Sequence, residues 1–263
     1  MTIRRRTARI LALLLGGLIA APDGAAQAAT CESARHDGHR FTACSAEIGT
    51  GAVRLFLHDA EGTPWGGFDR LARALVARGE RLVFAMNAGM YHPDRRPVGL
   101  YVEDGRRGAR IITSEGPGNF GMLPNGVFCV QAERFAIIES RRFAEAPPDC
   151  LQATQSGPML VIGGALHPRF LEDATSRLVR NGVGVSADGR RAWFVISDVP
   201  VTFHEFARIF RDGLGIDDAL YLDGNVSRLY APDLGRAGRG ARQLGPIVGL
   251  VLPARDAGGG GPN

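Results

Sequence analysis

The stretch Leu220-Tyr221-Leu222-Asp223-Gly224-Asn225-Val226-Ser227 ends an apolar run with an aspartate and turn-forming residues. The apolar residues 219–222 predict a short buried strand. An aspartate that follows such a strand is expected at the rim of a sheet, where it is partly desolvated. Asp-Gly is also a common turn pair, so Asp223 is either a functional carboxylate or a plain turn residue.

The residues before this stretch predict a helix and a hairpin. Thr202-Phe203-His204-Glu205 has the pattern of a capping box, in which the glutamate bonds back to the start of the helix. Apolar residues at helical spacing follow over 203–210. Asp188-Gly189 lies between the apolar segments 183–186 and 192–196, which predicts a tight hairpin.

The rest of the chain predicts many short strands and one more helix. Phe68, Leu71 and Leu75 recur at helical spacing, and Gly79 would end that helix. No alternation of strands and helices and no internal repeat is present. We therefore expect one α+β domain over 29–254, with a mostly antiparallel or mixed sheet and a few packed helices. The further predicted strands are 52–58, 82–86, 98–103, 109–113, 127–130, 136–139, 158–162 and 247–252.

Residues 1–28 have the three parts of an export signal. Arg4-Arg5-Arg6 is the positive segment, residues 10–21 are apolar, and Ala26-Gln27-Ala28 is a small-x-small cleavage site. The alternative is a membrane anchor, but a spanning helix needs about 20 apolar residues. The sequence thus predicts an exported protein, periplasmic or secreted, without a stable membrane span. The tail 255–263, which contains Gly258-Gly259-Gly260-Gly261, is predicted to be disordered.

The charge balance changes once the signal is removed. Residues 29–263 contain 27 basic and 26 acidic residues, so the basic isoelectric point gives no argument for a nucleic-acid partner. Every basic side chain other than histidine is arginine. Schiff-base chemistry and a P-loop lysine are therefore excluded, and an anion would be held by arginine, backbone amides, helix ends or a metal.

All four cysteines, Cys31, Cys44, Cys129 and Cys150, follow the predicted signal. An even number of cysteines in an exported protein suggests disulfides, and four cysteines allow three connectivities. We favour Cys31–Cys44 and Cys129–Cys150, because these pairs close the short loops. Neither spacing resembles a zinc-ligand pair.

The common catalytic motifs are absent. No G-x-S-x-G elbow, P-loop or dinucleotide fingerprint occurs, and Arg208 stands where a zinc-protease motif starting at His204 needs its second histidine. We therefore predict no cofactor and no metal ligand set. A divalent cation supported by Asp223 or Asp198 stays open, although no ligand spacing requires it.

Four segments, taken in order, resemble the phosphodiester glycosidase family over roughly residues 50–252. Asn87-Ala88-Gly89-Met90 matches the family's Asn-Gly-Gly-Phe turn, and Ser156-Gly157-Pro158-Met159-Leu160 matches its Ser/Gly-Gly-Pro-x-Leu segment. Arg180 precedes a Val-Gly strand, and residues 222–227 match Leu-Asp-Gly-Gly-Gly-Ser. The chain departs from the pattern at Ala88, Asn225 and Val226, which replace glycines, so a narrower pocket is expected and the substrate need not be N-acetylglucosamine.

The resemblance implies roles for these residues. Asp223 would be the catalytic carboxylate on the sugar side, and Arg180 would hold phosphate oxygens; a solvated arginine is the alternative. Asp198, which ends another apolar strand, and Glu205 are weaker catalytic candidates, since a plain strand exit and a helix cap explain them equally well. The predicted substrate-binding residues are Asn87, Gly89, Ser156, Gly157, Asn181, Gly224 and Ser227.

The function implied is an exported hydrolase that cleaves a sugar C1–O–phosphate linkage in an envelope or exopolysaccharide glycan. Its partner would be a carbohydrate or sugar-phosphate substrate. The alternative is a non-catalytic glycan-binding or envelope-assembly protein on the same fold, since fold alone does not determine function.

Overall fold

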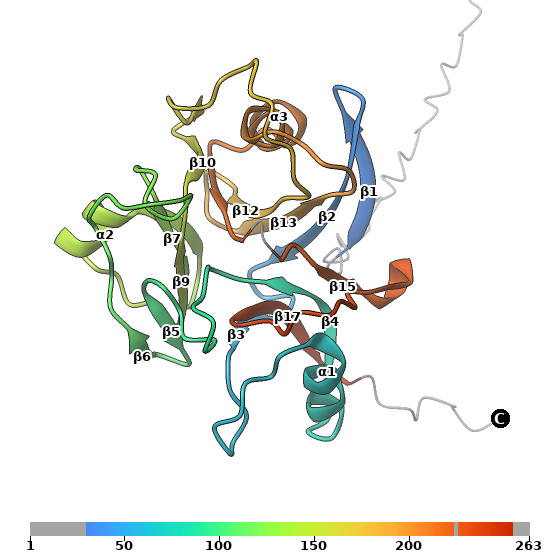
Figure 1. Cartoon of the computed structure of the whole chain (residues 1–263). Coiled ribbons are helices and arrows are strands. Elements are labelled where there is room, and N and C mark those ends of the chain that lie inside the picture. The colour runs from blue at the N-terminus through green and yellow to red at the C-terminus, as the bar shows by residue number, and fades with distance from the viewer. Residues whose placement is uncertain (1–29, 224–225, 255–263) are drawn as a thin grey trace, which may run out of the picture.

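The computed structural model describes residues 30–223 and 226–254. Three antiparallel sheets surround a common centre, and the helices lie on the outside (Figure 1). The predicted signal 1–28, the predicted tail 255–263 and Gly224 lie outside the described residues. Among the described residues, no helix is long and apolar enough to cross a membrane.

The largest sheet has seven strands in the order β1-β2-β13-β12-β14-β10-β11. In it the predicted hairpin is confirmed, because β12 and β13 pair antiparallel and Gly189 occupies the turn at φ 74°. The capped helix α3 and the π-helical segment η1 pack on this sheet through Phe206, Ile209 and Phe210. The elements are β1 (Cys31–His36), β2 (His39–Glu47), β10 (Met159–Ile162), β11 (Ala165–Leu166), β12 (Asn181–Val185), β13 (Arg191–Ser197), α3 (Phe203–Arg208), η1 (Ile209–Gly213) and β14 (Asp218–Tyr221).

The second sheet has five strands in the order β16-β15-β4-β17-β3. Helix α1 packs on one of its faces (Figure 1), where Phe68, Leu71 and Leu75 meet Leu82 and Ile247. The elements are β3 (Ala52–Phe56), α1 (Phe68–Val76), β4 (Glu80–Asn87), β15 (Leu229–Ala231), the 3-10 helix η2 (Pro232–Leu234), β16 (Arg236–Ala237) and β17 (Ile247–Pro253).

The third sheet also has five strands, in the order β6-β5-β9-β7-β8. Phe143 of helix α2 packs against it together with the Cys129–Cys150 disulfide. The elements are β5 (Tyr101–Glu103), β6 (Arg106–Ala109), β7 (Gly126–Val130), β8 (Phe135–Glu139), α2 (Ser140–Glu145) and β9 (Gln152–Ser156).

One hydrophobic core joins the three sheets. Phe84 of β4, Phe128 of β7 and Phe194 of β13 come from different sheets and are all buried. The rings of Phe84 and Phe194 lie 5.3 Å apart, and those of Phe128 and Phe194 lie 5.6 Å apart. Aromatic pairs at this spacing attract one another beyond the effect of burial. The chain therefore forms a single domain.

The structure confirms much of the predicted architecture and corrects part of it. Mostly antiparallel strands, few helices and both favoured disulfides, Cys31–Cys44 and Cys129–Cys150, are present. The strands form three sheets rather than one. The strand predicted over 109–113 is wrong, because β6 covers Arg106–Ala109 instead. Strands β1, β2 and β9 and helix α2 were not predicted.

Candidate active site

Two asparagines and an aspartate meet where two sheets join. Asn87 ends β4, Asn181 begins β12, and Asp223 follows β14. Asn181 Nδ2 donates to Asn87 O at 3.0 Å, and Asn87 Nδ2 donates to Asn181 Oδ1 at 3.3 Å. Asp223 N donates to Asn181 Oδ1, and Asp223 O accepts from Asn87 Nδ2, both at 3.3 Å. Both asparagines are fully buried. Loss of one of these hydrogen bonds would leave a buried polar group unsatisfied and would lower the free energy of unfolding.

Further hydrogen bonds hold Leu222, Ser227 and Arg228 in place near Asp223. Ser227 Oγ lies 2.9 Å from Val179 O, 3.0 Å from Asp223 O and 3.2 Å from Asn181 Oδ1. The amide of Arg228 donates to Asn87 Oδ1 at 2.8 Å. On the other side of Asp223, Ser156 Oγ donates to the carbonyl of Leu222. These hydrogen bonds position the backbone on both sides of Asp223.

The charge of Asp223 acts on two tyrosines, Tyr91 and Tyr221. Asp223 is 7% exposed. Burial raises the pKa of Tyr91, and the charge of Asp223 raises it further, whereas Arg228 acts in the opposite direction. Burial also raises the pKa of Tyr221, to about 12; Arg180 lowers it and Asp223 raises it. The two hydroxyls therefore stay protonated at neutral pH. The Tyr91 hydroxyl donates to Gln243 O at 3.1 Å, and Tyr221 is fully buried.

Arg180 is buried and held by neutral groups. Its side chain is 1% exposed and stacks on Phe203 with the guanidinium carbon 3.7 Å from the ring centre. Nε donates to Val201 O at 2.9 Å, Nη2 to Ser176 O at 3.2 Å and Nη1 to Tyr221 Oη at 3.4 Å. Arg180 forms no ion pair with a carboxylate of residues 30–223 or 226–254. Direct phosphate binding by Arg180 stays a prediction, and its contacts give it a second possible role in positioning Tyr221.

Gly89 and Gly157 allow backbones to approach closely beside this network. The Gly89 amide donates to Thr154 Oγ1 at 3.2 Å, and a Cβ at Gly89 would clash with the carbonyl of Gln155. A Cβ at Gly157 would lie 2.6 Å from Asn125 Cβ. Their substrate contacts stay predictions, but both positions require glycine for packing.

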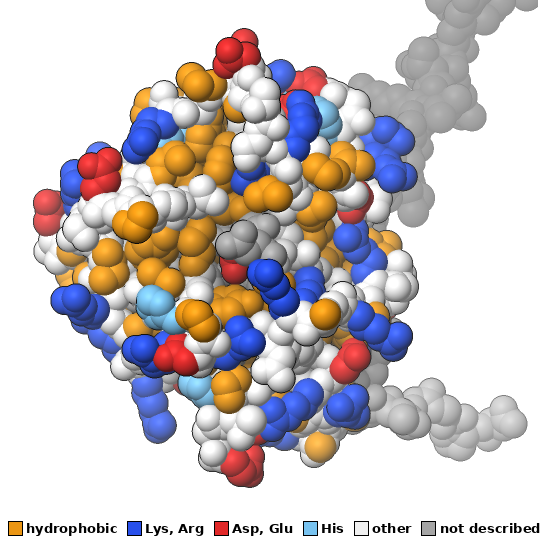
Figure 2. Space-filling model, in the orientation of Figure 1, with side chains coloured by type: hydrophobic (Ala, Val, Ile, Leu, Met, Phe, Trp, Pro, Cys, Tyr) orange, Lys and Arg blue, Asp and Glu red, His pale blue; other side chains and the backbone are white. Residues whose placement is uncertain are grey.

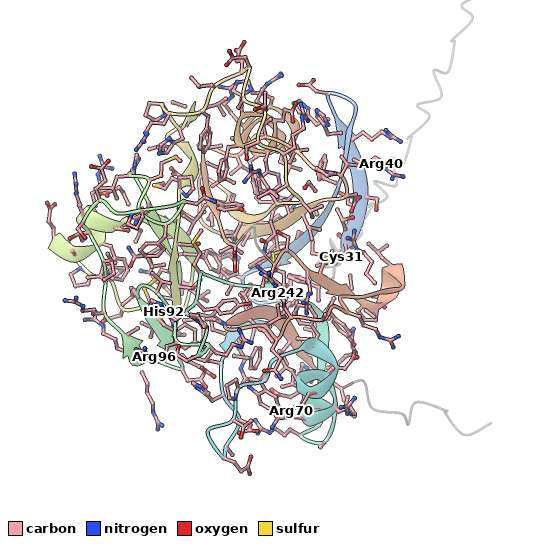
Figure 3. All side chains as sticks on the ribbon, in the orientation of Figure 1. Cys31, Arg40, Arg70, His92, Arg96 and Arg242 are labelled. Carbon is pink, nitrogen blue, oxygen red and sulfur yellow. A yellow bond between two sulfur atoms is a disulfide. The ribbon has the colours of Figure 1, made fainter. Side chains whose placement is uncertain are left out.

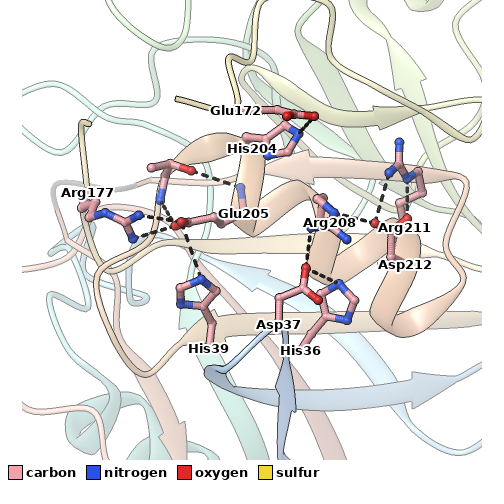
Figure 4. Close-up of polar contacts among 11 residues, drawn as sticks. His36, Asp37, His39, Glu172, Arg177, His204, Glu205, Arg208, Arg211 and Asp212 are labelled. Atoms are coloured by element: carbon pink, nitrogen blue, oxygen red, sulfur yellow. Dashed lines mark hydrogen bonds and ion pairs between the residues drawn. The ribbon is translucent and has the colours of Figure 1, made fainter. Parts of the chain in front are cut away.

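The two weaker catalytic candidates lie in other contacts. Asp198 accepts from Arg236 Nη1 at 2.6 Å and from Thr42 Oγ1 at 3.2 Å. Glu205 closes the predicted capping box with Thr202, which is confirmed. It also accepts from both terminal nitrogens of Arg177 and lies 3.6 Å from His39 Nε2 (Figure 4). Neither carboxylate has a hydrogen bond in the described structure to Asn87, Asn181 or Asp223.

The sequence is similar to known proteins. The phosphodiester glycosidase family model matches residues 80–249, which include Asn87, Asn181 and Asp223. The uncharacterized protein YigE of Escherichia coli (strain K12) is 34% identical over 181 residues, covering 69% of this chain and 70% of YigE.

The chain belongs to the phosphodiester glycosidase family.

A solved structure shows the same fold. The catalytic domain of zebrafish N-acetylglucosamine-1-phosphodiester alpha-N-acetylglucosaminidase, auto-inhibited by its pro-peptide, superposes with a TM-score of 0.55. The match covers 84% of this chain and 81% of that one, at 14% identity. At this identity the likeness concerns the fold, and residue roles have to be argued from this chain's own geometry.

The structure places Tyr91, Tyr221 and Arg228 near the candidate site residues. Tyr91 and Arg228 each stand next to a recognised motif in the sequence, but nothing in their spacing distinguishes them from surface residues. Only the fold places both near Asp223. No group of three or more His, Cys, Asp or Glu in the described part of the chain is arranged to hold a metal ion. The absence of a cofactor and the possible divalent cation therefore stay predictions.

Gly89→Ala is expected to lower the free energy of unfolding by about 1–3 kcal/mol, because overpacking forces the backbone to shift. The new Cβ would lie 2.5 Å from Thr154 Oγ1. Gly116→Ala is the matched control, since its Cβ would meet only Gly121 Cα at 3.9 Å. Urea unfolding measures both variants. Equal stability of the two would contradict the close approach at Gly89.

Tyr221 gives a prediction for alkaline pH. Its folded pKa of about 12 lies above that of an unfolded tyrosine, so only the folded protein keeps it neutral above pH 10. The contribution of neutral Tyr221 to the free energy of unfolding is complete below pH 10 and is lost as the pH rises through 12. Tyr221→Phe should therefore lose less stability than wild type between pH 9 and 12, by up to about 2 kcal/mol. The free energy of unfolding of both proteins is measured with urea across this pH range. An equal decrease in the two proteins would refute the raised pKa of Tyr221.

Proposed function

We propose that this protein is an exported hydrolase that cleaves the sugar C1–O bond of a glycosyl phosphodiester. The observation that supports this most is the meeting of three family motifs at Asn87, Asn181 and Asp223, which are hydrogen-bonded to one another although they are far apart in the sequence. The proposed substrate is a glycan of the cell envelope or an exopolysaccharide.

The proposed reaction needs a weaker general acid than ordinary glycoside hydrolysis does. Most glycosidases use two carboxyl groups, one of which protonates a poor leaving group. Here the leaving group is a phosphate monoester, whose second pKa is about 6, so it departs without a strong acid. One carboxylate is then sufficient on the sugar side, where positive charge develops. Asp223 takes this role in the proposal.

The phosphate side needs hydrogen-bond donors and positive charge. Arg228 supplies the charge, since it lies near Tyr91 and its burial lowers its guanidinium pKa without removing the charge. Tyr221 supplies a donor. Because Arg180 donates to the Tyr221 oxygen at 3.4 Å, the hydroxyl proton is left for another acceptor. Tyr221 is fully buried, so in the proposal a phosphate oxygen has to enter the wall of the site to accept that proton. Arg180 is thereby a positioning residue.

The remaining predicted residues hold the backbone around Asp223 in place through hydrogen bonds. Asn87, Asn181 and Ser227 orient the backbone on both sides of Asp223. Ser156 holds the carbonyl before it. Asp198 and Glu205 carry no step in the proposal, because both accept hydrogen bonds from arginines outside this network.

Export is proposed from the signal-like residues 1–28. The two disulfides support it, since structural disulfides persist mainly in oxidising compartments. Periplasm and external medium both fit, and fractionation of expressing cells would distinguish them.

The alternative is a non-catalytic glycan-binding protein. It is motivated by Asn225 and Val226, which replace family glycines; Asn225 lies outside the described residues. However, Val226 is only 7% exposed and packs in the cluster around Phe68 and Leu244. Its side chain fills the core beneath α1, so it gives no reason to expect a closed site.

The two functions are separated by assaying the mature protein on a panel of sugar-1-phosphodiesters and measuring free reducing sugar. Sugar release is expected for at least one substrate. Well-folded protein that binds these compounds, releases no sugar and is unaffected by Asp223→Asn would favour the binding function instead.

A further inference from the structure

A basic pocket adjoins the candidate active site. Four arginines line it, and Asp69 is its one acidic residue. Its walls include Gly66, Gly67, Gly238 and Gly240, so the lining there is backbone. The arginines come from three separate parts of the chain: Arg70 and Arg73 from α1, Arg228 from the loop after Asp223, and Arg239 from the segment after β16.

The positive charge of this pocket is not balanced. Arg70 pairs with Asp59 and lies over the Trp65 ring. Arg239 is 82% exposed, and its Nε is 3.9 Å from Asp69. Arg73 forms no ion pair with a carboxylate in the described parts of the chain. Since residues 29–263 carry nearly equal numbers of basic and acidic residues, such a local excess is not a consequence of composition.

Arg228 connects the pocket to the catalytic centre. Its amide donates to Asn87 Oδ1. Its charge lowers the pKa of Tyr91, whereas the charge of Asp223 raises it. Its guanidinium lies against Gly240, where a Cβ would come within 2.5 Å of Arg228 Cζ. Basic side chains lie around the centre of this face and over β15 and α1 (Figure 2). Figure 3 places Arg242 near the centre and Arg70 beside α1.

We infer that the substrate is a polymer of sugars joined by repeated phosphodiesters, and that this pocket binds the phosphodiester next to the one being cleaved. The inference rests on the proposed function and names its substrate class. A phosphodiester carries one full negative charge at each repeat, and guanidinium groups bind its oxygens in bidentate fashion. A neutral aglycone would leave Arg73 and Arg239 without a role. Because the chain has no lysine, the presence of arginine is by itself no evidence for phosphate binding. The evidence is that four arginines cluster in one pocket.

The test compares two ligands on matched variants. The first ligand is a sugar-1-phosphodiester with a single linkage; the second is an oligomer of four hexoses joined by phosphodiesters. Arg73→Ser with Arg239→Ser is expected to raise KM for the oligomer about tenfold and to leave kcat/KM for the single-linkage compound within about twofold. Arg106→Ser with Arg107→Ser, on exposed β6, is the control and should change neither. Salt should raise KM for the oligomer in wild type more than in the pocket variant.

Binding separates this inference from the proposed function. Calorimetry on Asp223→Asn protein, with and without the two pocket substitutions, gives the oligomer Kd without turnover. A tenfold weaker Kd in the pocket variant supports the inference even if no substrate is cleaved. An unchanged Kd and KM would overturn it. Equal affinity for a galacturonate tetramer, which has carboxylates and no phosphate, would overturn the assignment to phosphodiesters.

Discussion

Asp223→Asn is expected to lower kcat on a sugar-1-phosphodiester by about 10³-fold or more. The substitution keeps the size of the side chain and removes its negative charge. In the proposed reaction that charge stabilises the positive charge developing on the sugar. KM should change little, because the phosphate-binding groups stay in place. Steady-state release of reducing sugar measures both constants.

The same variant is expected to keep its fold. Asp223 bonds to Asn181, Asn87 and Ser227 through its backbone N and O, so the side-chain change leaves these contacts intact. Urea unfolding should agree with wild type within about 1 kcal/mol. Asp198→Asn is the matched control: it follows a strand too, but pairs with Arg236, and it should retain most activity. Activity above a tenth of wild type in Asp223→Asn would remove Asp223 from the mechanism.

Arg180→Ala is expected to lower both activity and stability, the latter by about 3 kcal/mol. The loss of stability follows from burial: the carbonyls of Val201 and Ser176 each lose a hydrogen bond from Arg180, and Phe203 loses the stacked guanidinium. The loss of activity follows from Tyr221, whose hydroxyl would no longer be oriented by Arg180. Activity is measured well below the midpoint of thermal unfolding, where the variant is folded.

Arg177→Ala serves as the control for Arg180. Arg177 is a half-exposed neighbour that pairs with Glu205 at the surface, and exposed pairs contribute about 0–1 kcal/mol. Tyr221→Phe should reproduce the activity loss of Arg180→Ala with much less destabilisation. If Arg180→Ala lost activity while Tyr221→Phe kept it, Arg180 would act on the substrate itself, as the sequence predicts.

The strand ends of the site could be predicted because they follow apolar runs. Asn87 is the last residue of β4, and Asp223 stands two residues after the end of β14; the apolar residues of both strands are buried. Strand β9 was missed because its residues Gln152–Ser156 are mostly polar and yet fully buried. Gln155 Oε1 accepts from the amides of Leu100 at 3.0 Å and Ile112 at 2.9 Å. Hydropathy cannot identify a polar strand whose partners come from distant parts of the chain.

The surroundings of the site depend on tertiary contacts in the same way. Arg180 had the expected position before β12, but its burial against Phe203 and Tyr221 requires α3 and β14 to be packed together. The pairing of Asp198 with Arg236 joins β13 to β16, which belong to different sheets. No local pattern contains these pairs, so sequence alone kept Asp198 as a second, weaker candidate beside Asp223.

The most direct test of the proposed reaction is hydrolysis of a sugar-1-phosphodiester in ¹⁸O-labelled water, followed by ³¹P NMR of the phosphate monoester. Attack at the sugar carbon puts the label in the sugar, so the phosphorus signal should show no isotope shift, and Asp223→Asn should yield no product above background. A phosphate product that carries ¹⁸O would show cleavage of the P–O bond and would contradict the proposed role of Asp223 at the sugar.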